Sequence, residues 1–165
     1  MLRKIFIFLF AIFISTNSTS KEIDKAYFGG GCFWCMEESF EKVDGVIEVI
    51  SGYSGGTTTN PTYKEVTYGD TGHFETVEII YDKSLTNFEE LLKIFWINVD
   101  PFDSQGQFCD KGYSYRSVAF YKNDLQKKQI MESLKKIEKD FDKKVVTYVR
   151  KSVSYTHLTL PTRAQ

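Results

Sequence analysis

The sequence lacks an excess of charge of either sign. Its 165 residues carry 21 Lys and Arg against 22 Asp and Glu, a formal net charge of −1 at pH 7. The two signs are interleaved and no basic face stands out, so nucleic acid is a poor candidate for a partner. There is also no internal repeat. We therefore expect one domain whose core is large enough to fold without metal or disulfide staples.

Cysteine and histidine are scarce. Only Cys32, Cys35, Cys109 and His73 are available as zinc ligands in the body of the chain, and only Cys32 and Cys35 are paired at ligand spacing. A structural zinc site usually shows a second paired knuckle, so the pattern argues against a metal centre. Three cysteines, an odd number, leave at least one thiol unpaired or engaged in exchange.

The one long apolar run lies at the N-terminus. Arg3 and Lys4 precede an unbroken apolar stretch over 5–14, and residues 15–20 are small and polar. This layout is typical of a secretory signal peptide, and the run is short for a membrane span. We expect residues 1–20 to be removed and the protein to be exported, periplasmic or secreted. The alternative is a protein anchored to the membrane by this segment.

Hydrophobic periodicity predicts strands alternating with helices between residues 21 and 152. One helix is expected to start at or beside Cys32, one at a capping box formed by Thr86 and Glu89, and one at Asn123. The strands are expected at 25–28, 46–53, 73–82, 117–121 and 145–149, with a turn-rich loop after the second and a loop over 100–112. The order predicts an α+β fold, a two-layer sandwich of a mixed sheet and flanking helices.

The stretch "YFGGGCFWCMEESF" (27–40) carries the most chemistry. Cys32 lies where the positive end of a helix dipole and unpaired N–H groups favour a thiolate, so it is a candidate nucleophile. The three preceding glycines allow a close approach of backbone and substrate. A thioredoxin-like dithiol is the rival interpretation, but there Trp precedes the first cysteine, whereas Phe33 and Trp34 here lie between the two. A small buried hydrophobic residue is the plainest alternative.

Five motifs in order resemble the peptide methionine sulfoxide reductases of the A type. They are "GGCFWC" (30–35), "GYSGG" (52–56), "NPTYKEV" (60–66), "GDTGHFE" (69–75) and "FCDKGYSYRS" (108–117). The resemblance covers about Ala26 to Val149 and implies a ferredoxin-like core. It implies reduction of methionine S-sulfoxide, free or in proteins, by thiolate attack, sulfenic acid formation and disulfide recycling. It also implies a monomer without cofactor or metal, restored by an external thioredoxin-type dithiol.

The resemblance assigns roles residue by residue. Cys32 matches the nucleophile, Glu75 the acid that protonates the sulfoxide oxygen, and Tyr63 and Tyr115 the phenols that hydrogen-bond it. A sulfoxide is electrophilic at sulfur only when its oxygen is protonated or strongly hydrogen-bonded, which requires an acid kept protonated by burial. Without the motifs, Glu75 would be read as a solvated strand residue and the tyrosines as core aromatics.

The remaining roles concern substrate binding and recycling. Phe33 and Trp34 match the apolar wall that holds the S-methyl group, and Asp110 matches a polar residue lining the same site. A second thiol must condense with the sulfenic acid, and Cys35 and Cys109 are both candidates.

The tail "SVSYTHLTLPTRAQ" (152–165) does not continue the resemblance. The family pattern has a segment resembling "AEDYHQ" here, whereas this tail resembles translated sequencing-adaptor sequence. We expect a C-terminally truncated reductase domain over 21–152 and a poorly packed, atypical tail over 153–165. Two other functions stay open: a thiol–disulfide oxidoreductase using Cys32 and Cys35 alone, and a secreted binding domain with a static disulfide.

Overall fold

The computed structural model describes residues 21–152 and the backbone of 155–157. The predicted signal peptide and the rest of the tail lie outside these residues.

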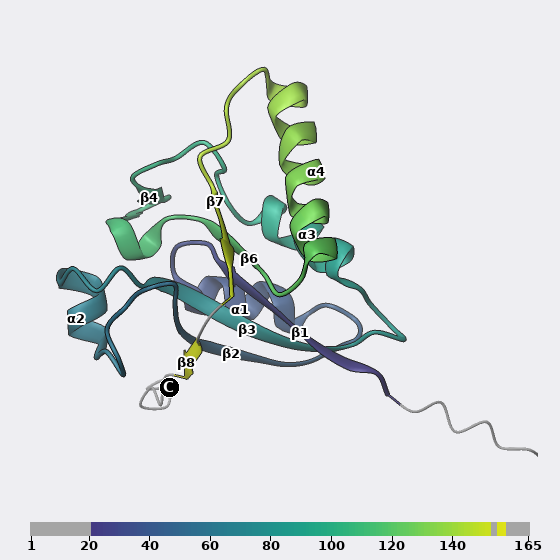
Figure 1. The fold of residues 1–165 in the computed structure, drawn as a ribbon, viewed down its shortest axis with the longest axis horizontal. Helices are drawn as coiled ribbons and strands as arrows, with labels where there is room; N and C mark the ends of the chain where they lie inside the picture. Colours follow the sequence, from purple (N-terminus) through teal and green to yellow (C-terminus); the bar gives the residue numbers. More distant parts are fainter. Residues whose placement is uncertain (1–20, 153–154, 158–165) are drawn as a thin grey trace, which may run out of the picture.

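A mixed sheet forms one layer of the fold (Figure 1). Its strand order is β7-β6-β1-β3-β2-β8; β6 and β7 run parallel, and the other neighbouring pairs that the structure describes are antiparallel. The strands are β1 (Ile23–Gly29), β2 (Val46–Ser54), β3 (Phe74–Asp82), β6 (Val118–Tyr121), β7 (Tyr148–Lys151) and β8 (Tyr155–His157). A separate hairpin joins β4 (Gly106–Gln107) to β5 (Asp110–Lys111).

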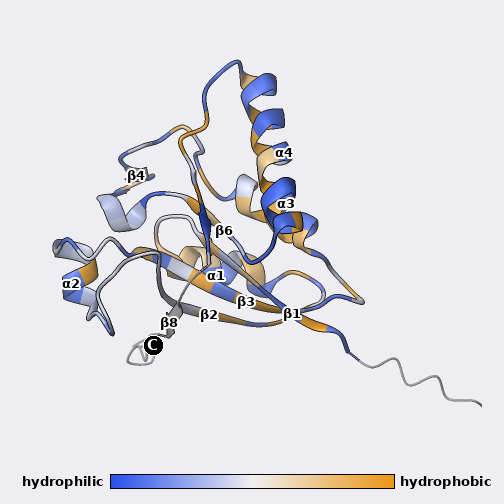
Figure 2. Ribbon diagram, in the orientation of Figure 1, coloured by the Kyte–Doolittle hydropathy of each residue, from blue (hydrophilic) through white to orange (hydrophobic). Residues whose placement is uncertain are grey.

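The helices are α1 (Phe33–Glu41), α2 (Tyr63–Tyr68), α3 (Phe88–Ile97), α4 (Asp124–Phe141) and a 3₁₀ turn, η1 (Tyr113–Tyr115). The second layer consists of α1, α3 and α4. α1 packs on β2 and β3, α3 on β1 and α4 on β6, and α3 touches both α1 and α4. Figure 2 shows α4 mostly hydrophilic, with apolar positions interspersed along it. The predicted α+β sandwich with a mixed sheet is confirmed.

The two faces of the sheet bury different sets of residues, because successive side chains of a strand point to opposite faces. Toward the helices, the Phe28 ring stacks on Phe40, Phe88 and Phe95, with ring centroids 5.7, 5.7 and 4.9 Å apart. On the other face Phe74, Val118 and Phe120 form a smaller cluster. The alternation turns Glu75, the neighbour of Phe74, toward the helices.

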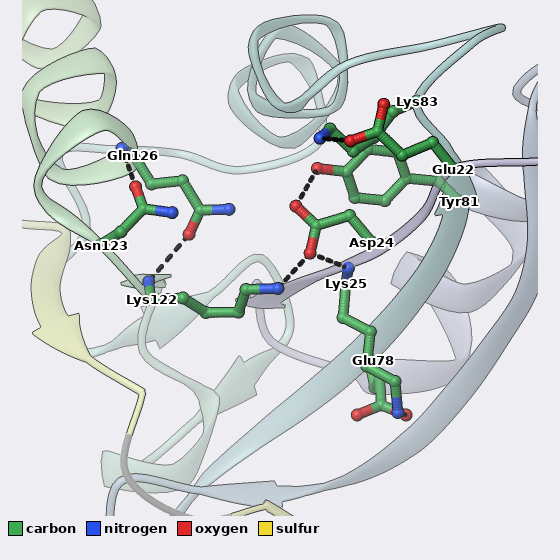
Figure 3. A network of polar contacts seen from close by, with 9 residues as sticks. All are labelled: Glu22, Asp24, Lys25, Glu78, Tyr81, Lys83, Lys122, Asn123 and Gln126. Atoms are coloured by element: carbon green, nitrogen blue, oxygen red, sulfur yellow. Dashed lines mark hydrogen bonds and ion pairs between the residues drawn. The ribbon is translucent and has the colours of Figure 1, made fainter.

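A polar network ties β1, β3 and the start of α4 together at one end of the sheet (Figure 3). Asp24 accepts hydrogen bonds from the Lys25 backbone N–H at 2.8 Å and the Tyr81 hydroxyl at 3.3 Å, and from the Lys122 ammonium. Asn123 caps α4 as predicted: its side chain accepts the Gln126 N–H at 2.9 Å.

Four local predictions differ from the structure. The last strand, predicted at 145–149, is β7 over Tyr148–Lys151, because residues 142–147 form an irregular connection after α4. Asn87, not Thr86, caps α3: its side chain accepts the Glu90 N–H at 3.1 Å, whereas the Thr86 N–H is used in a turn to Asp82. The helix α2 is absent from the elements that periodicity predicts. The predicted loop over 100–112 contains the β4–β5 hairpin.

The tail also departs from its expectation where it is described. Residues 155–157 pair with Gly52–Ser54 of β2 as the antiparallel edge strand β8. The backbone of this segment is therefore paired, although the tail was expected to be poorly packed.

Candidate active site around Cys32

The turn between β1 and α1 puts Cys32 at the start of a helix, as predicted. Gly31 has φ +82°, and a Cβ there would lie 2.7 Å from Cβ of Gln107, so both conformation and space require glycine. Cys32 is the N-cap residue, and its carbonyl accepts the N–H groups of Cys35 at 3.1 Å and Met36 at 3.3 Å. The half-buried Cys32 thiol thus lies at the first turn of α1.

Glu75 is a buried acid directly beside this turn. Only 1% of its surface is exposed, and its Oε2 accepts the Phe33 N–H at 3.3 Å. Burial raises the pKa of Glu75 to about 7; the Phe33 N–H opposes the rise and the charge of Asp110 adds to it. The carboxyl group can therefore carry a proton near neutral pH. Its interpretation as a solvated outward residue is wrong, since the side chain faces the helix layer.

Two phenols approach the same place from different elements. Tyr63 is the first residue of α2, fixed there by a capping box between Thr62 and Glu65. Tyr115 ends η1; its pKa is raised by burial, then by a hydrogen bond with Tyr63, then by the charge of Glu75. The two hydroxyl groups thus lie together within electrostatic reach of Glu75.

Aromatic rings stand beside the thiol. Phe33 is fully buried, tilted against Trp34 at 5.3 Å and stacked on Tyr53 at 6.0 Å between centroids. Trp34 is 41% exposed. An indole that is partly open to solvent next to a thiol is a suitable receptor for a methyl thioether group.

One cavity of about 410 Å³ has all three cysteines in its wall. It lies between α1, the end of α3 and the β4–β5 hairpin, and Asp110 lines it with Cys32, Cys35 and Cys109. All three are free thiols, and Cys35 and Cys109 are exposed. The pKa of Cys35 is raised, first by partial burial and then by the neighbouring Cys32, with smaller contributions from Asp110 and Glu38.

His73 shapes the loop that precedes Glu75. Its Nε2 donates to the Thr58 carbonyl at 2.8 Å, so its Nδ1 can accept the Gly56 N–H at 3.2 Å. A Cβ on Gly56 would lie 2.4 Å from this imidazole, so only glycine allows the contact. Both ring nitrogens are thereby used, which leaves His73 without an acid–base task.

Arg150 supports the site although the sequence analysis gave it no role. Arg150 on β7 donates to the Gly55 carbonyl and to the Tyr113 hydroxyl, both at 3.1 Å, and its guanidinium lies 5.0 Å from the Phe74 ring centre. It therefore links the loop after β2, the strand bearing Glu75 and the turn bearing Tyr115. No single-residue pattern predicts such a link, because it depends on three chain segments meeting.

Two further findings concern the described residues alone. Nowhere in 21–152 do three or more His, Cys, Asp and Glu side chains gather in a way that would hold a metal ion. No helix in that part of the chain is both long and apolar enough to cross a membrane.

Comparison with known proteins agrees with this geometry. The family profile described as peptide methionine sulfoxide reductase matches residues 24–158. The peptide methionine sulfoxide reductase MsrA of Listeria innocua is 45% identical over 139 residues, 83% of this chain and 78% of its own length. That of Halalkalibacterium halodurans is 46% identical over 131 residues, 78% of this chain and 74% of its own length.

Solved structures show the same fold. Mxr1 of Saccharomyces cerevisiae in reduced form superposes with a TM-score of 0.73 at 25% identity, covering 81% of this chain and 78% of its own. Mxr1 in complex with Trx2 superposes with a TM-score of 0.60 at 14% identity, covering 87% of this chain and 88% of its own. At this identity the superposition supports the fold alone. With the profile covering most of the chain and curated relatives above 40% identity, the chain belongs to the peptide methionine sulfoxide reductase family, among the MsrA proteins.

Proposed function

We propose that Cys32 attacks the sulfur of methionine S-sulfoxide while Glu75 protonates the departing oxygen. The chain is a peptide-methionine (S)-S-oxide reductase that returns the oxidised side chain to methionine, a repair reaction. The observation that carries the assignment of roles is the position of Glu75. Its carboxyl group is buried, has a pKa of about 7, and binds the N–H of the residue that follows Cys32.

The chemistry follows from a proton held next to a nucleophile. Protonation by Glu75 makes the sulfoxide sulfur electrophilic, and the Cys32 thiolate attacks it. Tyr63 and Tyr115 supply hydroxyl donors to the oxygen as charge develops on it. Overall, the Cys32 thiol and the sulfoxide give a Cys32 sulfenic acid and methionine, so the oxygen passes from one sulfur to the other. Phe33 and Trp34 hold the methyl end of the substrate, and Asp110 lines the adjoining cavity.

We assign the resolving role to Cys35, ahead of Cys109. Cys35 lies one turn after Cys32 in α1, close enough for Cys32 to raise the pKa of its thiol. Its thiol condenses with the sulfenic acid, giving a Cys32–Cys35 disulfide and water. Cys109 lines the same cavity and is the alternative. If it resolves instead, mass mapping after a single turnover will find a Cys32–Cys109 disulfide, and Cys35→Ser will keep its turnover.

The reductant is a dithiol of thioredoxin type, which returns the enzyme disulfide to two thiols and becomes a disulfide itself. Support comes from yeast Mxr1, which forms a complex with Trx2, and from the exposure of Cys35 and Cys109 at the surface. Oxidised proteins with accessible methionine sulfoxide are the substrates, and the protein acts as a monomer, which size-exclusion chromatography tests.

The protein is exported through residues 1–20, whose positive start and apolar run over 5–14 support a signal peptide. Cell fractionation and N-terminal sequencing test this. A mature chain beginning near Lys21 in the periplasm or medium is expected. An uncleaved chain in the membrane would favour the anchor, and a chain in the cytoplasm would contradict export altogether.

The decisive assay for the activity uses the full chain, dithiothreitol and a short peptide carrying either the S or the R epimer of methionine sulfoxide. Turnover of the S epimer alone is expected, lost in Cys32→Ser and strongly reduced in Glu75→Gln. A folded protein that reduces neither epimer would instead be a plain dithiol oxidoreductase if it reduces a protein disulfide and the Glu75→Gln variant does so equally well.

A further inference from the structure

The structure leaves a tyrosine hydroxyl without a partner at the heart of the site. The Tyr53 side chain is fully buried, and its hydroxyl accepts or donates no hydrogen bond within residues 21–152. Oε1 of Glu75 is buried and unpartnered in the same way. Burying a polar atom without a partner is unfavourable, and such atoms are usually paired with protein, water or ligand. The Tyr53 hydroxyl and Oε1 of Glu75 therefore either pair with each other or share a partner.

Strand register brings these two residues together. Tyr53 on β2 lies directly opposite Glu75 on β3. Directly opposed residues point to the same face with Cβ atoms about 5 Å apart. The Phe33 ring stacks on the Tyr53 ring at 6.0 Å, and the Phe33 N–H holds the other carboxylate oxygen, Oε2. One residue of α1 thus fixes both the tyrosine ring and the carboxyl group.

The electrostatic surroundings place the hydroxyl end of Tyr53 in the site. Burial raises the pKa of Tyr53, and the charges of Glu75, Tyr63 and Tyr115 raise it further, so the phenol keeps its proton. The groups that face Glu75 are Tyr53 from β2, the Phe33 N–H from α1, Tyr63 from α2, Tyr115 from η1 and Asp110 from β5. Apart from the Phe33 N–H, only hydroxyl groups in this set can donate to the carboxylate.

We propose that Tyr53 is a positioning residue for the acid: its hydroxyl pairs with Oε1 of Glu75, directly or through one water molecule. The inference rests on the proposed role of Glu75. In the protonated acid, Oε1 carries the proton that is passed to the sulfoxide oxygen. When the Oε1–H bond breaks and the new O–H bond forms on the sulfoxide, the Tyr53 hydroxyl donates to the carboxylate that remains. Tyr53 keeps its own proton throughout.

The arrangement predicts a signed effect on the titration of Glu75. A hydrogen bond to the ionised carboxylate favours that form and lowers its pKa. Removing the Tyr53 hydroxyl therefore raises the pKa of Glu75 above its value in the wild type, while making the acid slower to give up its proton. The pH at which activity falls on the alkaline side should move up, and the plateau rate should drop.

The test is Tyr53→Phe in the full chain, assayed with an S-sulfoxide peptide and dithiothreitol from pH 5 to 9. The variant keeps the ring and its stacking on Phe33. We expect kcat to fall on the order of tenfold to a hundredfold and KM to stay within about twofold. The alkaline limb of the pH–activity profile should shift to higher pH. The matched control is Tyr81→Phe, which removes another buried hydroxyl from β3. Its partner is Asp24, and Tyr81 lies six residues along the strand, roughly 20 Å from Glu75. Tyr81→Phe should leave kcat and the alkaline limb unchanged.

Loss of activity in Tyr53→Phe with an unmoved alkaline limb, or full activity, would overturn the proposal. If Tyr53→Phe does not fold, the wild type still decides: a slowly exchanging Tyr53 hydroxyl proton should be visible by NMR and shift as pH crosses about 7, but not in Glu75→Gln. Its absence overturns the proposal. Failure of the proposed function is distinguishable, because then wild type itself shows no turnover of the sulfoxide.

Discussion

Replacing Glu75 by Gln should stabilise the protein at alkaline pH while impairing it as an enzyme. The wild-type carboxyl group is buried and has a pKa of about 7, against 4.5 for an ordinary glutamate. Because the folded-state pKa is raised, the contribution of this group to stability is fully present below pH 4.5. It is lost progressively as pH rises through about 7. Gln is nearly isosteric, still accepts the Phe33 N–H and does not titrate.

The magnitude follows from the width of that window. A rise from 4.5 to about 7 corresponds, at about 1.36 kcal/mol per pH unit, to roughly 3 kcal/mol of unfolding free energy. The difference in stability between Glu75→Gln and wild type should therefore be close to zero at pH 4. It should grow in favour of the variant between pH 4.5 and 7, and level off near pH 8 at up to roughly 3 kcal/mol.

Urea denaturation at pH 4, 6 and 8, followed by tryptophan fluorescence, measures this difference. Glu78→Gln is the matched control, since Glu78 is also buried on β3 but forms an ion pair with Lys25 at 2.9 Å. Losing that pair should destabilise the protein at pH 8, the opposite sign. If Glu75→Gln is no more stable than wild type at pH 8, or if the difference does not change with pH, the buried-acid argument is refuted.

Other predictions follow from the same geometry. Turnover of the S epimer should decline as pH rises above about 7, because the proton on Glu75 is lost there; a kcat that is flat to pH 9 would contradict this. Arg150→Met removes the hydrogen bonds to Gly55 and Tyr113, so thermal denaturation and kinetics should show about 1–3 kcal/mol of lost stability and a lower kcat; unchanged values would show that the link is dispensable. Gly31→Ala should lower stability by more than about 1 kcal/mol, because φ is +82° and the new Cβ would lie 2.7 Å from Gln107; a variant as stable as wild type would mean the turn adapts freely.

The strands and the main helices could be predicted because their side chains alternate or recur with the right period. Examples are the first strand, predicted at 25–28 and observed as β1 over Ile23–Gly29, and the helix that begins after Cys32. The helix α2 was missed because it is six residues long, buries only Val66 and follows a turn-rich segment. Its capping box at Thr62 and Glu65 was a usable indication. The capping-box spacing of Thr86 and Glu89 was misleading, because the Thr86 N–H already donates to the Asp82 carbonyl in a turn.

The motifs indicate the residues that we propose to react, but they do not indicate the residues that support them. Glu75 stands out in "GHFE", whereas the importance of Tyr53 depends on a cross-strand register that periodicity does not fix. Arg150 matters only because β7 brings it to Gly55 and Tyr113. The grouping of three thiols on one cavity likewise depends on the position of the β4–β5 hairpin.

The most direct test of nucleophilic attack by Cys32 is a single turnover without added reductant. Fully reduced protein is mixed with excess S-sulfoxide peptide, and methionine and free thiols are counted together by mass spectrometry. We predict one methionine per protein molecule, two thiols lost to a disulfide that includes Cys32, and no methionine from Cys32→Ser. Methionine formed by Cys32→Ser, or formed by wild type with all three thiols still free, would contradict the account.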